Sequence, residues 1–146
     1  MDFDTQVKLA IYHHFADTAQ PPTVEDIVRR LAADREAVRR SFAALRVARV
    51  LYLEPDAETI RMAPPFSGVA TQHIVEVRER RYFANCAWDA LGIAAALHAP
   101  AVVRSECAES GKALLLPVGL DGPTPSRWLF HSLVPAARWW DDLVFT

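Results

Sequence analysis

A thiol and a carboxylate lie three residues apart at Cys86 and Asp89. If the surrounding stretch is helical, this spacing places both side chains on one face of the helix. A thiolate binds soft metal ions, and a neighbouring carboxylic acid can hold the proton that the thiol loses and return it. Few reactions need this pair alone. Cleavage of a carbon–mercury bond is one of them, because the thiolate would hold the metal and the acid would protonate the departing carbon.

Each of the two residues also has an interpretation without chemistry. Cys86 could be a small apolar side chain of the core, and Asp89 could be an acidic residue favoured by the helix dipole. A place near a helix start argues for function, because exposed N–H groups stabilise a thiolate there, and we expect a lowered pKa for Cys86. The bulky neighbours Tyr82 and Trp88 are expected to desolvate Asp89 and raise its pKa, which suits a general acid.

Three helices are predicted ahead of this segment. An apolar stripe at helical spacing predicts the first over residues 3–16. Thr23 is the predicted N-cap of the second helix, with Asp26 as the partner in a capping box, and Asp34 is the predicted N-cap of the third. The side chains expected to face inward are Val7, Ala10, Ile11, Phe15, Val24, Ile27, Val28, Leu31, Val38, Phe42 and Leu45.

A hairpin is predicted to follow the helices, with strands at residues 50–53 and 59–62. Three helices and a hairpin form a winged helix-turn-helix. The Pro- and Gly-containing stretch 64–68 marks the predicted boundary between a winged-helix domain, 1–63, and a second domain, 64–146.

The second domain is expected to have an α+β fold with a small mixed, mostly antiparallel sheet. The predicted strands are 71–77, 101–106, 113–118 and 128–134, and the predicted helices are 83–97 and 136–144.

Composition restricts the class of protein. Of the 146 residues, 51% are hydrophobic, which is enough to fill a core. The net charge of −2 does not favour a chain that binds nucleic acid through its overall charge. The start Met1-Asp2-Phe3-Asp4 lacks the features of a signal peptide, and no apolar stretch approaches the length of a membrane span, so we expect a cytoplasmic protein with two free thiols.

The segment 82–93, Tyr-Phe-Ala-Asn-Cys-Ala-Trp-Asp-Ala-Leu-Gly-Ile, resembles the active-site helix of the alkylmercury lyase (organomercurial lyase) family. Residues 1–62 resemble the N-terminal winged-helix part of that family, and 61–67 resemble the linker that follows it. Residues 104–108 resemble the strand with the family's structural cysteine. Residues 130–140 resemble the strand and helix near its end, so the resemblance covers nearly the whole chain.

The resemblance implies an enzyme of mercury resistance that cleaves an organomercurial by protonolysis to a hydrocarbon and Hg(II). Cys86 would bind mercury and Asp89, beside the metal, would transfer the proton. Cys107 would be a packing residue and a less favoured mercury ligand. Mercury would be substrate and product, so no resident cofactor is expected. Small cytosolic thiols or a mercuric reductase would carry the ion away.

The sequence departs from the family in one respect. Family members with demonstrated chemistry are expected to carry a second catalytic cysteine before a Val-Pro pair, and alignment on Val134-Pro135 places it near Pro125 or Ser126. Neither residue can be a thiolate, so we expect slow turnover or dependence on an external thiol. The chain also stops at Phe145-Thr146, where relatives are expected to continue, which leaves room for a missing C-terminal thiol.

Two other hypotheses remain open at this stage. One is a winged-helix transcriptional regulator that senses a metal or small ligand through Cys86, and the other is a relative that has lost mercury chemistry. The arginines of the second and third predicted helices are compatible with DNA recognition. They are equally compatible with a solvated basic face balanced by acidic side chains, and we expect no specific DNA binding. The arginines are Arg29, Arg30, Arg35, Arg39, Arg40, Arg46 and Arg49, and the acidic residues are Glu25, Asp26 and Glu36.

Overall fold

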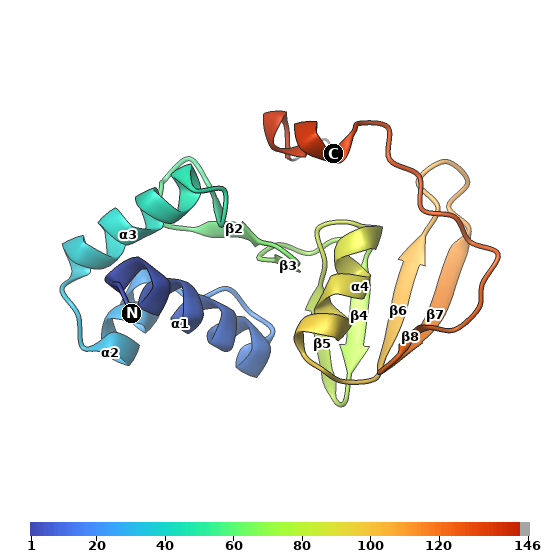
Figure 1. Ribbon diagram of the computed structural model, residues 1–146, viewed down its shortest axis with the longest axis horizontal. Helices are drawn as coiled ribbons and strands as arrows, with labels where there is room; N and C mark the ends of the chain where they lie inside the picture. Colours follow the sequence, from blue (N-terminus) through green and yellow to red (C-terminus); the bar gives the residue numbers. More distant parts are fainter. Residues whose placement is uncertain (144–146) are drawn as a thin grey trace.

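The computed structural model describes residues 1–143 and has an α+β architecture (Figure 1). Its elements are α1 (Phe3–Thr18), α2 (Val24–Leu31), α3 (Arg35–Val47), β1 (Tyr52–Leu53), β2 (Ile60–Ala63), β3 (Phe66–Ser67), β4 (Ile74–Val77), β5 (Arg80–Phe83), α4 (Ala87–Ala96), β6 (Ala101–Glu106), β7 (Ala113–Gly119), β8 (Gly122–Pro123) and the 3-10 helix η1 (Ala136–Asp141).

The three N-terminal helices begin where local capping chemistry places their starts. Thr23 and Asp26 form the predicted capping box at α2, since the side chain of each residue accepts a hydrogen bond from the backbone amide of the other. Asp34 caps α3 by accepting a hydrogen bond from the Ala37 amide over 2.9 Å. The apolar stripes face inward as predicted, and the largest fully buried side chains include Phe15 and Phe42.

The small sheet that follows has three antiparallel strands in the order β1-β2-β3. A turn at Pro64-Pro65, which contains a cis peptide bond, joins β2 to β3. The backbone amide of Gly68 then donates to the Arg61 carbonyl over 2.7 Å. The stretch 64–68 therefore folds back on β2 and packs within the structure.

The second sheet has five antiparallel strands in the order β5-β4-β6-β7-β8. Helix α4 lies across β4 and β6 on one face of this sheet (Figure 1). The side chains that face α4 are buried, among them Val75 on β4 and Val103, its partner on β6. The helix that carries the candidate site thus rests on the middle strands.

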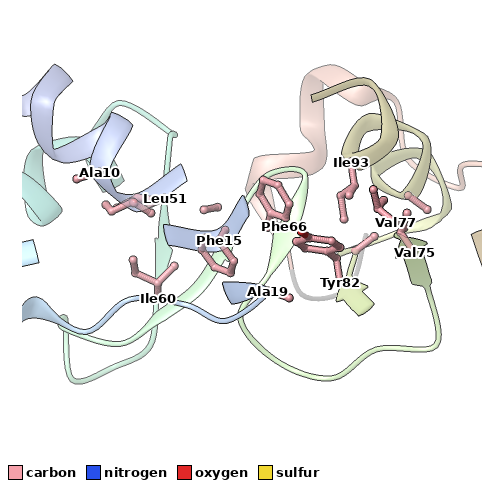
Figure 2. Close-up of a cluster of buried hydrophobic side chains, with 14 of the residues drawn as sticks. Ala10, Phe15, Ala19, Leu51, Ile60, Phe66, Val75, Val77, Tyr82 and Ile93 are labelled. Atoms are coloured by element: carbon pink, nitrogen blue, oxygen red, sulfur yellow. The ribbon is translucent and has the colours of Figure 1, made fainter. Parts of the chain in front are cut away.

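One apolar core runs from the N-terminal helices into the second sheet (Figure 2). Phe66 lies at its centre, with ring contacts to Phe15 on α1 and to Tyr82 on β5. The Tyr82 hydroxyl donates to the Ala16 carbonyl near the end of α1 over 2.7 Å. This carbonyl belongs to the last turn of the helix, where backbone acceptors lack helical partners.

Several predicted elements differ from the structure. The strand predicted at 71–77 is the shorter β4, which begins at Ile74. The helix predicted from Phe83 begins at Ala87, because the preceding stretch pairs with β4 as the unpredicted strand β5. No strand forms at 128–134, where the backbone has no neighbouring strand to pair with. The predicted helix 136–144 is the shorter 3-10 helix η1, and its last residue, Val144, lies outside the described residues.

The segment after β8 lies over the surface and leads to η1, near the start of α4 (Figure 1). Large apolar side chains of this segment face solvent, with Leu129 90% and Leu133 80% exposed. Among the helices of residues 1–143, none is long and apolar enough to cross a membrane.

Candidate active site at the start of α4

Cys86 is the N-cap residue of α4. Its backbone is extended, with φ −150° and ψ 178°, and its Sγ accepts a hydrogen bond from the Asp89 amide at 3.5 Å. The Cys86 carbonyl accepts the first helical bond from Ala90 over 3.1 Å. A sulfur in this position faces the unpaired amides and the positive end of the helix dipole. The structure therefore brings the two predicted site residues together across the first turn.

Asp89 is half-buried in that first turn. Burial raises the pKa of its carboxyl, and the hydrogen bond from the Asn85 amide, 2.9 Å from Nδ2 to Asp89 Oδ2, opposes the rise. The predicted direction for Asp89 is confirmed. A carboxyl whose pKa lies above its ordinary value holds a proton more readily near neutral pH, as a general acid requires.

The predicted lowering of the Cys86 pKa was wrong. Burial raises the pKa of the thiol, and the negative charge of Asp89 adds to the rise. The amides of Asp89 and Trp88 lower it by hydrogen bonding, but burial has the larger effect. The raised pKa favours the neutral thiol over the thiolate.

The aromatic neighbours differ in what they contribute. Tyr82 is 3% exposed but points to α1, where it binds the Ala16 carbonyl. Trp88 is 56% exposed, and its ring contacts Phe130 with centroids 5.8 Å apart. Trp88 therefore does not bury the site as the sequence suggested.

An open apolar groove of about 490 Å³ lies beside Trp88, between α4 and the C-terminal segment. Neither Cys86 nor Asp89 lines it, so the groove adjoins the site through Trp88 alone. Its lining residues are Trp88, Phe130, Ser132, Leu133, Val134, Pro135, Ala136 and Trp139.

Cys107 lies in the turn between β6 and β7. Its amide donates to the Lys112 carbonyl over 2.9 Å, and its carbonyl accepts from Gly111 over 2.8 Å. Hydrogen bonds from Ser110 and from the Glu109 amide lower the pKa of its thiol. The more acidic thiol of the described chain is therefore Cys107, outside the helix start.

The positions expected to hold a second catalytic cysteine lie in the irregular segment after β8. Pro125 and Ser126 are exposed, and the Ser126 hydroxyl accepts a hydrogen bond from the Trp128 amide over 3.1 Å. In residues 1–143, no group of three or more His, Cys, Asp or Glu side chains could hold a metal ion. Within these residues, Cys86 and Asp89 form a pair and not part of a larger cluster of this kind.

Sequence reasoning missed two residues around Asp89. Asn85 was not predicted as a site residue, although its place directly before Cys86 indicates that its side chain can reach the site. Tyr12 comes from α1 and had no such signal, because it lies 77 positions before Asp89 in the sequence. The pKa of Tyr12 is raised to about 12, first by burial and then by the charge of Asp89. Its hydroxyl donates to the Pro64 carbonyl over 2.9 Å.

Comparison with known proteins decides the family. The family model described as MerB, alkylmercury lyase, matches residues 66–146, which include Cys86 and Asp89. The chain belongs to the alkylmercury lyase family. The prediction of the family from the 82–93 segment is thereby confirmed.

The fold of this alkylmercury lyase family member is similar to that of a solved structure, described as the mercury-bound form of MerB2. The TM-score is 0.66 at 19% sequence identity. The match covers 84% of this chain and 60% of that chain, so the chain spans less than two thirds of the MerB2 length. A comparison with curated proteins finds no match.

Proposed function

We propose that this family member cleaves the carbon–mercury bond of organomercurials, releasing a hydrocarbon and Hg(II). The observation that carries the proposal is the first turn of α4, where the Cys86 sulfur accepts from the amide of Asp89, whose carboxyl has a raised pKa. The thiol supplies a soft ligand and the carboxyl supplies a proton carrier.

The protons balance in two steps. First, the Cys86 sulfur bonds to mercury, the former ligand leaves as an anion, and the thiol proton moves to the Asp89 carboxylate. Second, Asp89 gives that proton to carbon, which keeps the electron pair of the breaking carbon–mercury bond. Mercury stays divalent throughout, and Asp89 returns to its ionised form. The raised pKa of Asp89 favours its acceptance of the proton, and the raised pKa of Cys86 favours the neutral thiol that supplies it.

An external thiol completes the proposed reaction. After protonolysis Hg(II) would be held by Cys86, with no thiolate available at Pro125 or Ser126. A small cytosolic thiol would supply the second sulfur ligand and remove the ion, and a mercuric reductase would be a suitable recipient.

We further propose that residues 1–63 are a winged-helix domain retained as scaffold for the domain 64–146. The rival role as a DNA-binding regulator is less well supported, because acidic side chains engage the arginines that would face DNA. Glu58 lies 2.8 Å from Arg35 and 2.7 Å from Arg39, and Glu25 lies 2.8 Å from Arg35.

The test is incubation with phenylmercury and measurement of benzene in the headspace. We expect benzene from the wild type, none from Cys86→Ala, and mercury retention without benzene from Asp89→Asn. Cys107→Ala is the matched control and should behave as wild type. Full activity in Cys86→Ala would refute the site, and a wild type that binds mercury at Cys86 without releasing benzene would refute the reaction.

A further inference from the structure

The Asn85 side chain makes an unusual set of contacts directly before the site. Its Nδ2 lies 2.9 Å from Asp89 Oδ2, 3.2 Å from the Phe66 carbonyl and 3.4 Å from the Pro65 carbonyl. All three neighbours are acceptors, so the amide nitrogen must face them, because the opposite orientation would place oxygen against three oxygens. The Asn85 amide therefore joins Asp89 to the turn between β2 and β3.

The turn itself is held from two sides. From α1, the Tyr12 hydroxyl donates to the Pro64 carbonyl over 2.9 Å. From α4, Gly92 approaches so closely that an added Cβ would lie 3.1 Å from Pro65 Cβ. The acceptors that fix the Asn85 amide are thus part of a packed structure.

Asn85 binds one carboxyl oxygen of Asp89 and leaves the other available. Among residues 1–143, Asp89 Oδ1 has no hydrogen-bond partner, and the Asn85 Oδ1 atom is buried without one. An amide donor favours the ionised form of the carboxyl that it contacts. Asn85 therefore fixes the rotation of the carboxyl and limits the rise in its pKa that burial causes.

We propose that Asn85 is a positioning residue that anchors the proton-carrying carboxyl of Asp89 to the Pro64–Phe66 turn, with Oδ1 left to exchange the proton. This inference rests on the proposed function, because the role of Asp89 as proton carrier belongs to the proposed lyase reaction. It also gives the N-terminal helices a part in the site, since α1 holds the turn through Tyr12.

The chain is well suited to a direct test, because Asn85 is its only asparagine. Selective labelling of asparagine with ¹⁵N gives a single side-chain amide signal, which can be followed against pH in the unmodified protein. We expect this signal to titrate with the pKa of Asp89, measured separately from its ¹³C-labelled carboxyl, and to lose the titration in Asp89→Ala, which cannot ionise and keeps Asn85 as the only asparagine. A signal that ignores pH, or that titrates unchanged in Asp89→Ala, would overturn the proposal.

The kinetic test compares Asn85→Ala with Gln72→Ala, an exposed amide outside the site, as the matched control. In a single turnover with phenylmercury, we expect Asn85→Ala to bind mercury at Cys86 normally and to release benzene about 10- to 100-fold more slowly. The pKa of Asp89 should be higher in this variant than in the wild type. An unchanged rate and an unchanged pKa would refute the positioning role.

The two proposals fail in different ways. If the wild type releases no benzene, the lyase reaction is refuted while the amide titration still decides the role of Asn85. If Asn85→Ala does not fold, the titration in the wild type decides alone. If the titration couples Asn85 to Asp89 and benzene release slows, both proposals are supported.

Discussion

The rings of Phe15 on α1 and Phe66 on β3 lie nearly parallel, with centroids 5.2 Å apart and planes 9° from each other. Both side chains are almost fully buried. Because Phe66 leads directly to the turn that binds Asn85, this contact ties the packing of the N-terminal helices to the geometry of the site.

Replacement of Phe66 by alanine should therefore destabilise the whole chain. We expect a loss of about 3–5 kcal/mol in the free energy of unfolding, the usual range for a large buried aromatic side chain. Urea unfolding, followed by tryptophan fluorescence, measures this loss of stability. The control is Leu9→Ala on α1, because the Leu9 side chain is partly exposed. Two separate transitions, only one of them shifted, would show that the two parts fold independently.

The two thiols should differ in reactivity, with Cys107 ahead of Cys86, although the sequence predicted a lowered pKa for Cys86. Burial raises the pKa of Cys86, whereas hydrogen bonds in the turn lower that of Cys107. At pH 7 iodoacetamide, which reacts with thiolates, should modify Cys107 first, and the rate at Cys86 should keep rising at more alkaline pH. Peptide mass spectrometry of the wild type and of each Cys→Ala variant gives the rates. Faster labelling of Cys86 at pH 7 would contradict the effect of burial.

Asp89 should make stability fall as pH rises. Because its pKa is higher in the folded than in the unfolded state, the folded protein binds more protons between the two values, and stability decreases upward from about pH 4. Asp89→Asn cannot ionise, so its stability relative to wild type should increase over this range in urea unfolding.

The matched control is Asp56→Asn. Hydrogen bonds from Thr59 lower the pKa of Asp56, so this carboxyl stabilises the fold above its unfolded pKa, and the stabilisation is lost as pH falls. The two variants should therefore change relative stability in opposite directions with pH. A parallel change would mean that Asp89 is not desolvated in solution.

An added small thiol should accelerate repeated turnover of phenylmercury but leave the first turnover unchanged. The first turnover needs only Cys86 and Asp89, whereas each later one needs removal of Hg(II) from a single sulfur. Benzene release with and without excess thiol, in burst and steady-state phases, separates the two. A steady-state rate that does not respond to thiol would contradict the missing-ligand argument.

The full chain should show no sequence preference for duplex DNA at about 150 mM salt. Fluorescence anisotropy with labelled duplexes of different sequence measures this. Glu58→Gln removes the carboxylate shared by Arg35 and Arg39, so it should strengthen non-selective binding at low salt. Tight, selective retention by the wild type at 150 mM would instead favour the regulator hypothesis.

How well each element could be predicted depended on the distance along the sequence between the residues that stabilise it. The starts of α2 and α3 were predicted because Thr23 and Asp34 cap helices through bonds within one turn. The strand predicted at 128–134 was wrong because apolar residues alone do not supply a pairing partner. The start of α4 was placed too early because strand β5 depends on its pairing with β4.

The two central residues of the site could be predicted from the sequence, but their surroundings in the folded chain could not. Cys86 and Asp89 were identified from their spacing, which the helix start preserves. The pKa of Cys86 could not be predicted, since burial, which depends on the folded chain, outweighs the helix amides. Tyr12 was out of reach for the same reason, because only the folded core brings α1 to the turn at Pro64.

Gly92 lies within α4, where helix propensity alone would favour alanine by about 1 kcal/mol. The added methyl group would require Pro65 to move by a few tenths of an ångström, and the carbonyl that Asn85 contacts would move with it. Selection for thermal stability would therefore favour alanine at position 92, whereas selection for turnover would retain glycine.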